Sequence, residues 1–384
     1  MRKQWVYTNT VIIDEISMVS YETFVKIHQR LKDIKNVNCD SFFGGLNVIA
    51  LGDLYQLPPV PPGHFVSSGK SQLNTHPWKD LFTMLELEQN MRQKDDIQYG
   101  NLLLRIRTST HTNDDSRSRI KSPIECNLEP YSSALHLFPS VKKCEDHNMF
   151  KLSQLAKFTA MYCIKAHHSI VDFKKNQKNT SDQSFITNLI PADDRECAGL
   201  LNQLHLCVGA VVMLRRNIYT ADGLANGVRG SIVGFEWKNG IAPINPLDGY
   251  LPEKIIISCF DSKVGQLAKA ETNCTYIPIC AVTAEFHGKY GSVLVRTQLP
   301  LSLSWAATIH KVQGLTLSNA VIDIGNDVFS PGMSYVALSR VKSLNGLALL
   351  SLNVGAIHCS PEVEEEMIKN SHENLNENEN VLEE

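Results

Sequence analysis

Two adjacent carboxylates, Asp14 and Glu15, directly follow a short apolar run at residues 11–13. Acids in this position, at the carboxyl end of a buried parallel strand, are placed to meet a ligand at the edge of the sheet. Asp14 could hold Mg²⁺, directly or through water, and Glu15 could orient and deprotonate the water that attacks a γ-phosphate. The alternative is an ordinary strand end with two solvated acids. The pair therefore needs support from other residues.

A candidate partner of this acid pair, Gln56, lies in the segment GDLYQLPPV (52–60). A glutamine amide can donate a hydrogen bond to a γ-phosphate and accept one from a water molecule. Arg92 and Arg340 each follow an apolar segment. An arginine that reaches a transferring phosphoryl group stabilises its spreading charge. Taken singly, the glutamine fits a proline-stiffened turn, and each arginine fits a surface ion pair.

The segment TIHKVQG, residues 308–314, groups His310, Lys311 and Gln313 in what the sequence predicts to be one helical turn before a glycine. Such a cluster can grip a nucleic-acid backbone. The alternative is a solvated helix end.

Alternating strands and helices are expected to position these residues. We predict a buried parallel strand at 11–13, a helix over 20–35 with Ser20 as its N-cap, a second strand within 46–60 and a third over 84–93. This alternation is typical of a parallel α/β domain, whose ligands bind at the carboxyl ends of the strands.

The rest of the chain predicts a linker and then a second α/β region that a β-rich stretch interrupts. Residues 108–130 are polar, and a strand-like run begins at Ala134. Short strands separated by Gly, Asn and Pro over 205–260 are typical of a small β-barrel. After Arg296 the α/β pattern returns, with helices predicted over 304–314 and 333–340 and strands over 320–325 and 346–351.

Charge is distributed unevenly along the 384 residues. The net charge is −3, but the final 24 residues carry nine Glu and one Lys, so the remainder is basic by about +5. The acidic segment lacks aromatic residues and apolar periodicity, which predicts disorder. A mildly basic body permits a nucleic-acid partner. No apolar run is long enough to span a membrane, and the ten Cys form no CxxC pair, which suits a reducing compartment.

Seven motifs, taken in chain order, resemble those of Pif-type superfamily-one DNA helicases, and look most like the copies carried by eukaryotes and by Helitron transposons. They are VIIDEISMVS, ALGDLYQLPPV, LELEQNMRQ, LHLFPSVKKCEDHN, GLANGVRGSIVGF, RTQLPLSLSWAATIHKVQGLTL and MSYVALSRVKSLNGL. The similarity covers roughly residues 5–355, and its motifs are long and specific. The resemblance implies two RecA-like motor domains with ATP in the cleft between them. It also implies single-stranded DNA across their tops and 5′-to-3′ translocation.

The resemblance also assigns roles to individual residues. Asp14 and Glu15 match the Mg²⁺-binding and water-activating pair. Gln56 matches the γ-phosphate sensor, and Arg92 and Arg340 match the two phosphate-contacting arginines. In the motif that couples the nucleotide to DNA, the residues expected at DNA are Thr308, His310, Lys311 and Gln313, and Gly314 is expected at the nucleotide.

The predicted fold is therefore α/β, with two RecA-like parallel-sheet motor domains and a small SH3-like β insertion in the second. The predicted divisions are a partial first motor domain at 1–107, a linker at 108–130, a second motor domain at 131–204 and 297–358, the insertion at 205–296 and an acidic disordered tail at 359–384.

One family motif, the phosphate-binding loop G-x-x-x-x-G-K-[ST], has no match in the 384 residues. The segment from Gly63 to Ser71 has five residues between its glycines instead of four, and it follows a proline-rich loop rather than a strand. We therefore expect a Pif-type, ATP-dependent DNA helicase represented by an incomplete chain. The alternatives are an ATPase-inactive, transposon-derived protein that binds single-stranded DNA, and a scaffold without motor activity.

The expected cofactors are Mg²⁺ and ATP, and the expected partner is single-stranded DNA. We expect no membrane association, a monomer, and a location in the nucleus or the cytosol. The processes that the resemblance implies are DNA repair, DNA recombination and telomere maintenance.

Overall fold

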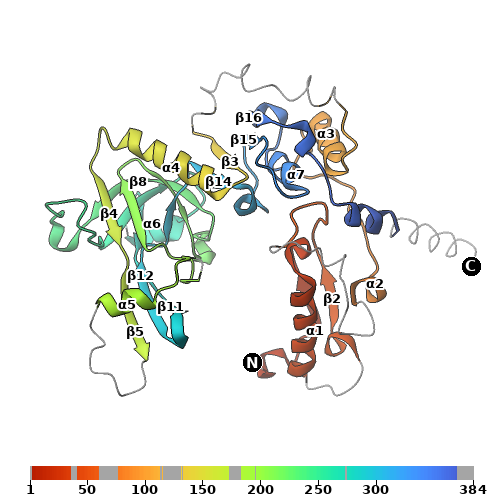
Figure 1. The fold of residues 1–384 in the computed structure, drawn as a ribbon, viewed down its shortest axis with the longest axis horizontal. Coiled ribbons are helices and arrows are strands. Elements are labelled where there is room, and N and C mark those ends of the chain that lie inside the picture. The colour runs from red at the N-terminus through yellow and green to blue at the C-terminus, as the bar shows by residue number, and fades with distance from the viewer. Residues whose placement is uncertain are drawn as a thin grey trace, which may run out of the picture. The chain divides into compact units, whose positions relative to one another are not determined.

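The computed structural model describes residues 2–35, 41–59, 77–112, 115, 131, 133–172, 183–194, 196–272 and 275–369. The chain forms two compact units (Figure 1). Unit 1 combines Met1–Ser140 with Thr308–Glu384, and unit 2 is Val141–Ala307. The boundaries of these units differ from the predicted domain boundaries at 107, 131, 205 and 297, which stay a prediction. Every predicted site residue lies in unit 1.

Unit 1 begins with two parallel strands, β1 (Thr10–Ile13) and β2 (Asn47–Ala50), with helix α1 (Tyr21–Lys35) between them in the chain. Ile13 lies opposite Ala50, so the segments that follow the two strands leave the sheet at the same edge. Ser20 caps α1 as predicted, because its hydroxyl accepts a hydrogen bond from the Thr23 N–H at 3.2 Å. The strand β1 is present as predicted but is only partly buried, since Ile12 is 63% exposed.

A second parallel sheet in unit 1 contains β3 (Leu135–Phe138), β15 (Ala320–Ile324) and β16 (Leu347–Leu352), with β15 in the middle. All of β15 is buried, as its continuous apolar sequence predicts for a central parallel strand. Helix α3 (Ile97–Arg107) contacts helix α7 (Met333–Leu338), where the Tyr99 hydroxyl donates to the Leu338 carbonyl at 2.8 Å. These contacts join the segments around residues 100 and 335 into one unit.

Unit 2 is mainly antiparallel. Its five-stranded sheet has the order β10 (Ile277–Cys280), β9 (Lys254–Cys259), β8 (Arg229–Glu236), β7 (Val211–Leu214) and β13 (Leu301–Leu303). A three-stranded sheet has the order β11 (Val282–His287), β12 (Val293–Gln298) and β5 (His167–Asp172), and β4 (Met161–Lys165) pairs with β6 (Gln203–Cys207). The helices are α4 (Val141–Leu155), α5 (Gln183–Leu189) and α6 (Gln266–Thr272).

The strands predicted within 205–260 are therefore present, while the SH3-like character of this region stays a prediction. Within the described ranges, no helix is long and apolar enough to cross a bilayer.

Two sequence-based predictions of secondary structure in unit 1 were wrong. Residues 84–90 form no strand, and Leu85 and Leu87 are 87% and 93% exposed, because no described strand pairs with this segment. The segment 304–314 is not an α-helix. It holds the short strand β14 (Ala306–Thr308) and a single 3₁₀ turn, Ile309–Val312, after which Gly314 takes a positive φ of 78°. Burial of β14 outweighs the helical propensity of its alanines.

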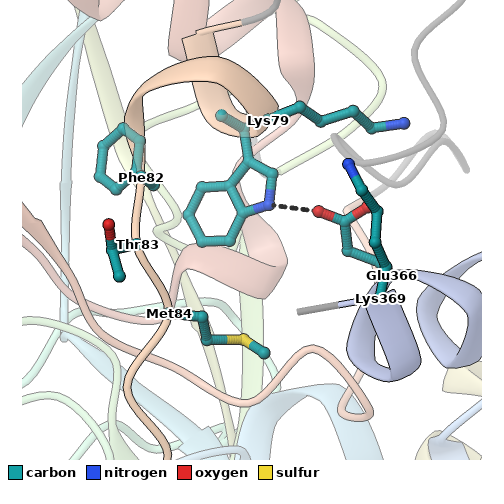
Figure 2. Close-up of a pocket in the computed structure, with 7 residues that line it drawn as sticks. Lys79, Phe82, Thr83, Met84, Glu366 and Lys369 are labelled. Atoms are coloured by element: carbon teal, nitrogen blue, oxygen red, sulfur yellow. Dashed lines mark hydrogen bonds between the residues drawn. The ribbon is translucent and has the colours of Figure 1, made fainter. Parts of the chain in front are cut away.

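The predicted disordered tail was wrong for its first part. Residues 361–369 form a helix that begins with Pro361, a residue well suited to a first helical turn. Val363 is fully buried in a core with Phe24 and Trp78. The Trp78 Nε1–H donates to Glu366 Oε1 at 3.2 Å (Figure 2). The i, i+3 spacing of Val363 and Glu366 places both on one helix face, so tertiary contacts order an acidic sequence. Residues 370–384 lie outside the described residues.

Candidate nucleotide and nucleic-acid site

The ends of β1 and β2 hold the acid pair in a close backbone crossing. The Ile16 N–H donates to the Leu51 carbonyl at 2.9 Å, and a Cβ at Gly52 would stand 2.9 Å from the Ile16 nitrogen. Glu15 has left-handed backbone angles (φ 53°, ψ 47°), which cost a non-glycine residue about 1 kcal/mol. Asp14 is exposed, and its Oδ1 accepts the Glu15 N–H at 2.8 Å. The turn thus holds the two acids with one exposed and the other half-buried.

Glu15 meets the segment that was predicted to contact DNA. The side-chain Nε2 of Gln313 donates to Glu15 Oε2 at 3.0 Å. A Cβ at Gly314 would lie 3.6 Å from the other oxygen of the same carboxylate. The amide oxygen of Gln313 is buried and accepts no hydrogen bond from the described protein. Gln313 and Gly314 therefore stand at the acid pair.

Gln56 lies beside Asp53, the acid that follows β2. Its Nε2 donates to Asp53 Oδ2 at 3.4 Å, and its Oε1 is buried without a hydrogen-bond partner among the described protein atoms. Leu57 and the two prolines after it are buried, which holds the loop in place. A carboxylate can only accept hydrogen bonds, so Asp53 fixes which end of the Gln56 amide points away. The group that remains is an acceptor, suited to a water proton.

Arg92 and Arg340 lie near one another around this site. Arg92 donates from Nε to Thr316 Oγ1 at 3.0 Å and from Nη1 to the Ser339 carbonyl at 3.1 Å. Arg340 is 1% exposed and donates from Nε to the Val336 carbonyl at 2.8 Å. Within the described part of the chain, neither guanidinium forms an ion pair with a carboxylate.

The electrostatics of the two arginines favour an anion. Burial, and after it the positive charge of Arg92, lowers the pKa of Arg340 to about 10, although Glu15 acts in the opposite direction. Burial also lowers the pKa of Arg92. Two neighbouring like charges, one half-buried and one buried, gain from a bound anion, and a phosphate group provides one with several acceptor oxygens.

Sequence reasoning missed three residues of this site: Asp53, Arg107 and Tyr335. Arg107, the last residue of α3, forms an ion pair with Asp53 at 3.1 Å. Burial, and after it the nearby Asp53 carboxylate, raises the pKa of Tyr335. The sequence did contain a signal for Asp53, because this acid follows the second strand as Asp14 follows the first. Nothing in the local sequence indicates that Arg107, 54 positions away, is its partner.

The remaining residues predicted to bind DNA are arranged around the 3₁₀ turn. Thr308 is buried, whereas Lys311 is exposed. The His310 ring stacks on Phe329 with centroids 5.9 Å apart and planes 16° apart, and Phe329 is 66% exposed. Burial lowers the pKa of His310, so its ring is neutral near pH 7. The predicted DNA role of these residues stays a prediction.

Other features of unit 1 do not provide this chemistry. A small pocket lies beside the 361–369 helix, but no predicted site residue lines it (Figure 2). Over the ranges that the structure describes, no three His, Cys, Asp or Glu side chains gather into a metal cage. The segment from Gly63 to Ser71 lies outside the described residues.

Family models match two parts of this chain, and curated relatives match it along most of its length. A model described as PIF1-like helicase matches residues 1–115, and one described as the 2B domain of DNA helicase Pif1 matches residues 196–235. ATP-dependent DNA helicase PIF1 of Homo sapiens is 31% identical over 369 residues, and that of Danio rerio is 30% identical over 367. Each match covers 94% of this chain and 49% of the relative. The chain thus spans about half the length of these relatives.

Solved structures share the fold. The crystal structure of Pif1 helicase from Candida albicans matches with a TM-score of 0.72 and 24% identity, covering 96% of this chain and 78% of that one. Pif1 helicase from Bacteroides, solved with ADP-AlF3 and single-stranded DNA, matches with a TM-score of 0.65 and 23% identity, covering 96% and 76%. The predicted α/β fold with RecA-like parallel sheets is therefore confirmed. In its motifs, its curated relatives and its fold, the chain is similar to PIF1-like helicases.

Proposed function

We propose that this chain is the motor part of an ATP-dependent DNA helicase that moves 5′-to-3′ along single-stranded DNA. The hydrogen bond from Gln313 to Glu15 carries the proposal, because it links the segment expected at DNA to the expected water-activating acid. The similarity to PIF1-like helicases supports the reaction class. The alternatives without ATPase activity rest only on the missing match to the phosphate-binding loop.

In the proposed reaction each side chain has a separate task. Glu15 takes one proton from the attacking water, and the unpartnered amide oxygen of Gln56 accepts from the other O–H to orient it, while Gln313 Nε2 holds the Glu15 carboxylate. Arg92 and Arg340 stabilise the charge that spreads over the transferred phosphoryl group. Arg340 donates from Nε, Nη1 and Nη2 to protein oxygens, and its five N–H groups leave donors for a phosphate.

Mg²⁺ fits the donors at the end of β1. Asp14 is an exposed single carboxylate, and no cage of three ligating side chains lies among the described residues. Mg²⁺ characteristically keeps several waters and binds to one or two carboxylates together with substrate phosphates. Asp14 would therefore hold the ion, and the ion would neutralise charge on the phosphates.

Single-stranded DNA is the proposed partner, and His310, Lys311 and Phe329 are its proposed contacts. Lys311 offers a charge to a phosphate, and the exposed ring of Phe329, stacked on His310, offers a flat apolar face to a base. The protein would then act as a monomer wherever DNA is found, including the nucleus.

ATP hydrolysis with and without an oligonucleotide tests the proposal. The assay uses the 384-residue chain and the same chain joined at Met1 to the segment that carries the phosphate-binding loop in a relative. Hydrolysis stimulated by DNA is expected, and Glu15→Gln should abolish it, because the amide keeps the shape and removes the base. The control is Glu22→Gln, the same change at an exposed position of α1. DNA binding without Glu15-dependent hydrolysis in either form would contradict the helicase proposal and support the inactive alternative.

A further inference from the structure

Arg107 carries an inference that deepens the proposed function and rests on it. We infer that Arg107 is a positioning residue for ATP hydrolysis, which acts through Asp53 to orient the side chain of Gln56. Two sets of contacts in unit 1 and the local charge support this role.

The first set fixes Arg107 itself. Its Nε lies 3.2 Å from Asp53 Oδ1 and 3.4 Å from Oδ2, and its Nη2 lies 3.1 Å from Oδ1. The guanidinium also lies over the Tyr55 ring, 4.4 Å from its centroid. Nη1 faces Glu86 Oε1 at 3.6 Å. A carboxylate on two sides and an aromatic face on a third leave this side chain one orientation.

The second set fixes what Asp53 can do. Its Oδ1 also accepts the Tyr55 N–H at 3.2 Å, and its Oδ2 accepts Gln56 Nε2 at 3.4 Å. The carboxylate is therefore saturated by donors and is not available to a cation, although it follows a strand end as Asp14 does. It instead holds the amide of Gln56.

The third consideration is charge. Asp53 and Arg107 side chains are each 18% exposed, so a lone carboxylate here would repel the phosphates of a nucleotide with little screening by solvent. Arg107 cancels that charge. Burial alone would lower the pKa of Arg107, but the attraction of Asp53 outweighs it and raises that pKa, so the guanidinium stays charged. Arg107 thus lets an acid orient Gln56 without opposing the substrate.

The matched control is Arg105, two residues earlier on α3. It forms an equally direct ion pair with Asp115 at 2.6 Å, and neither residue contacts Asp53 or Gln56. Arg105→Met and Arg107→Met therefore both remove an arginine near the end of α3 together with its ion pair. Only Arg107→Met also removes the connection through Asp53 to Gln56.

The experiment measures kcat and KM for ATP in the form of the chain that hydrolyses ATP, together with its affinity for an oligonucleotide. Arg107→Met should lower kcat by about 10- to 100-fold, leave KM and DNA affinity nearly unchanged, and slow turnover far more than Arg105→Met. Arg107→Lys should recover part of the loss, because it keeps the charge and loses the two-pronged geometry. In the Gln56→Ala background, Arg107→Met should have almost no further effect.

Each outcome is decisive. The inference would be overturned if Arg105→Met and Arg107→Met lowered kcat equally, or if the effects of Arg107→Met and Gln56→Ala on kcat were fully additive. In both cases the parent chain would still show Glu15-dependent hydrolysis, so the proposed function would remain. If Arg107→Met does not fold, Arg107→Lys becomes the test. The inference then requires that Arg107→Lys lowers kcat and leaves KM unchanged. A parent chain without Glu15-dependent hydrolysis would remove the proposed function and the inference with it.

Discussion

Gln313 donates from Nε2 to Glu15 Oε2 at 3.0 Å, which joins residues separated by 298 positions in the sequence. Glu15 lies just after β1, and Gln313 follows the 3₁₀ turn that carries His310 and Lys311. Any displacement of that turn moves the donor that holds the Glu15 carboxylate. The bond is a direct physical route between the proposed DNA contacts and the proposed reaction centre.

We predict that Gln313→Ala reduces the stimulation of ATP hydrolysis by DNA about 10-fold, because Glu15 loses the donor that orients it. Affinity for the oligonucleotide should stay nearly unchanged. Hydrolysis rates with and without DNA, and fluorescence anisotropy, measure the two effects. Gln29→Ala, at an exposed position of α1, is the control. A large loss of affinity with normal stimulation would instead make Gln313 a DNA contact.

Gly332→Ala should destabilise the protein strongly. Gly332 has a φ of 72°, and a Cβ there would stand 2.3 Å from the Tyr55 carbonyl oxygen and 2.9 Å from that of Gln56. Backbone atoms cannot rotate away, so we expect a loss of about 2–4 kcal/mol in the free energy of unfolding. Gly45 has a similar φ of 76° but nothing within 4 Å of its Cβ position, so Gly45→Ala should cost about 1 kcal/mol. Urea unfolding measures both, and equal losses would refute the close approach.

The helix at residues 361–369 is expected to be part of the folded core. Val363→Ala should lower the free energy of unfolding by about 2 kcal/mol, since Val363 is fully buried against Phe24 and Trp78. Ile368→Ala, on the same helix but 53% exposed, should change it by less than about 0.5 kcal/mol. Chemical denaturation followed by tryptophan fluorescence compares the two. No difference between them would mean that this helix does not pack as described.

Replacement of His310 and Lys311 together by Ala should weaken binding to single-stranded DNA and make its dependence on salt shallower. Removing one lysine contact to a phosphate reduces the slope of log affinity against log salt by about 0.7. Anisotropy of a labelled oligonucleotide across a salt series gives both quantities. Lys26→Ala, an exposed lysine of α1, provides the comparison. Unchanged affinity and slope would place the DNA surface elsewhere.

Unit 2 should lose stability in mild acid through His168. Arg296 Nε donates to His168 Nε2 at 2.8 Å, and burial, followed by the charge of Arg296, lowers the pKa of His168 to about 4. Asp194 opposes this shift and His167 adds to it. The pKa of His168 in the folded state lies below the ordinary value of 6.5. The stability that the neutral His168 side chain provides is therefore complete above about pH 6.5 and is lost as the pH falls towards 4.

His168→Gln, whose carbonyl oxygen can still accept from Arg296, should therefore lose less stability than the parent between about pH 7.5 and about pH 5. The urea midpoint at each pH measures the difference. His167→Gln, at the exposed neighbouring position, should behave as the parent does. An identical acid response in all three proteins would remove His168 from the explanation.

Local sequence was sufficient for the features that depend on local interactions. The apolar runs at β1, β2, β3, β15 and β16 predicted strands, and Ser20 predicted the start of α1, since burial of one face and capping of the first turn need few distant partners. Residue type also indicated the chemistry. Acids at a strand end, a glutamine in a proline-stiffened loop and two arginines predicted a phosphate site before any contact was known.

Only the tertiary structure decided which of these groups meet. Asp53 follows a strand end as Asp14 does, yet Arg107 engages it, and that partner is 54 residues away on a different helix. The acidic sequence after residue 360 predicted disorder, yet burial of Val363 orders its first nine residues. Leu85 and Leu87 have strand-forming spacing but pair with no described strand. In each case the deciding free energy comes from a contact between distant segments, and composition and periodicity report only on neighbours along the chain.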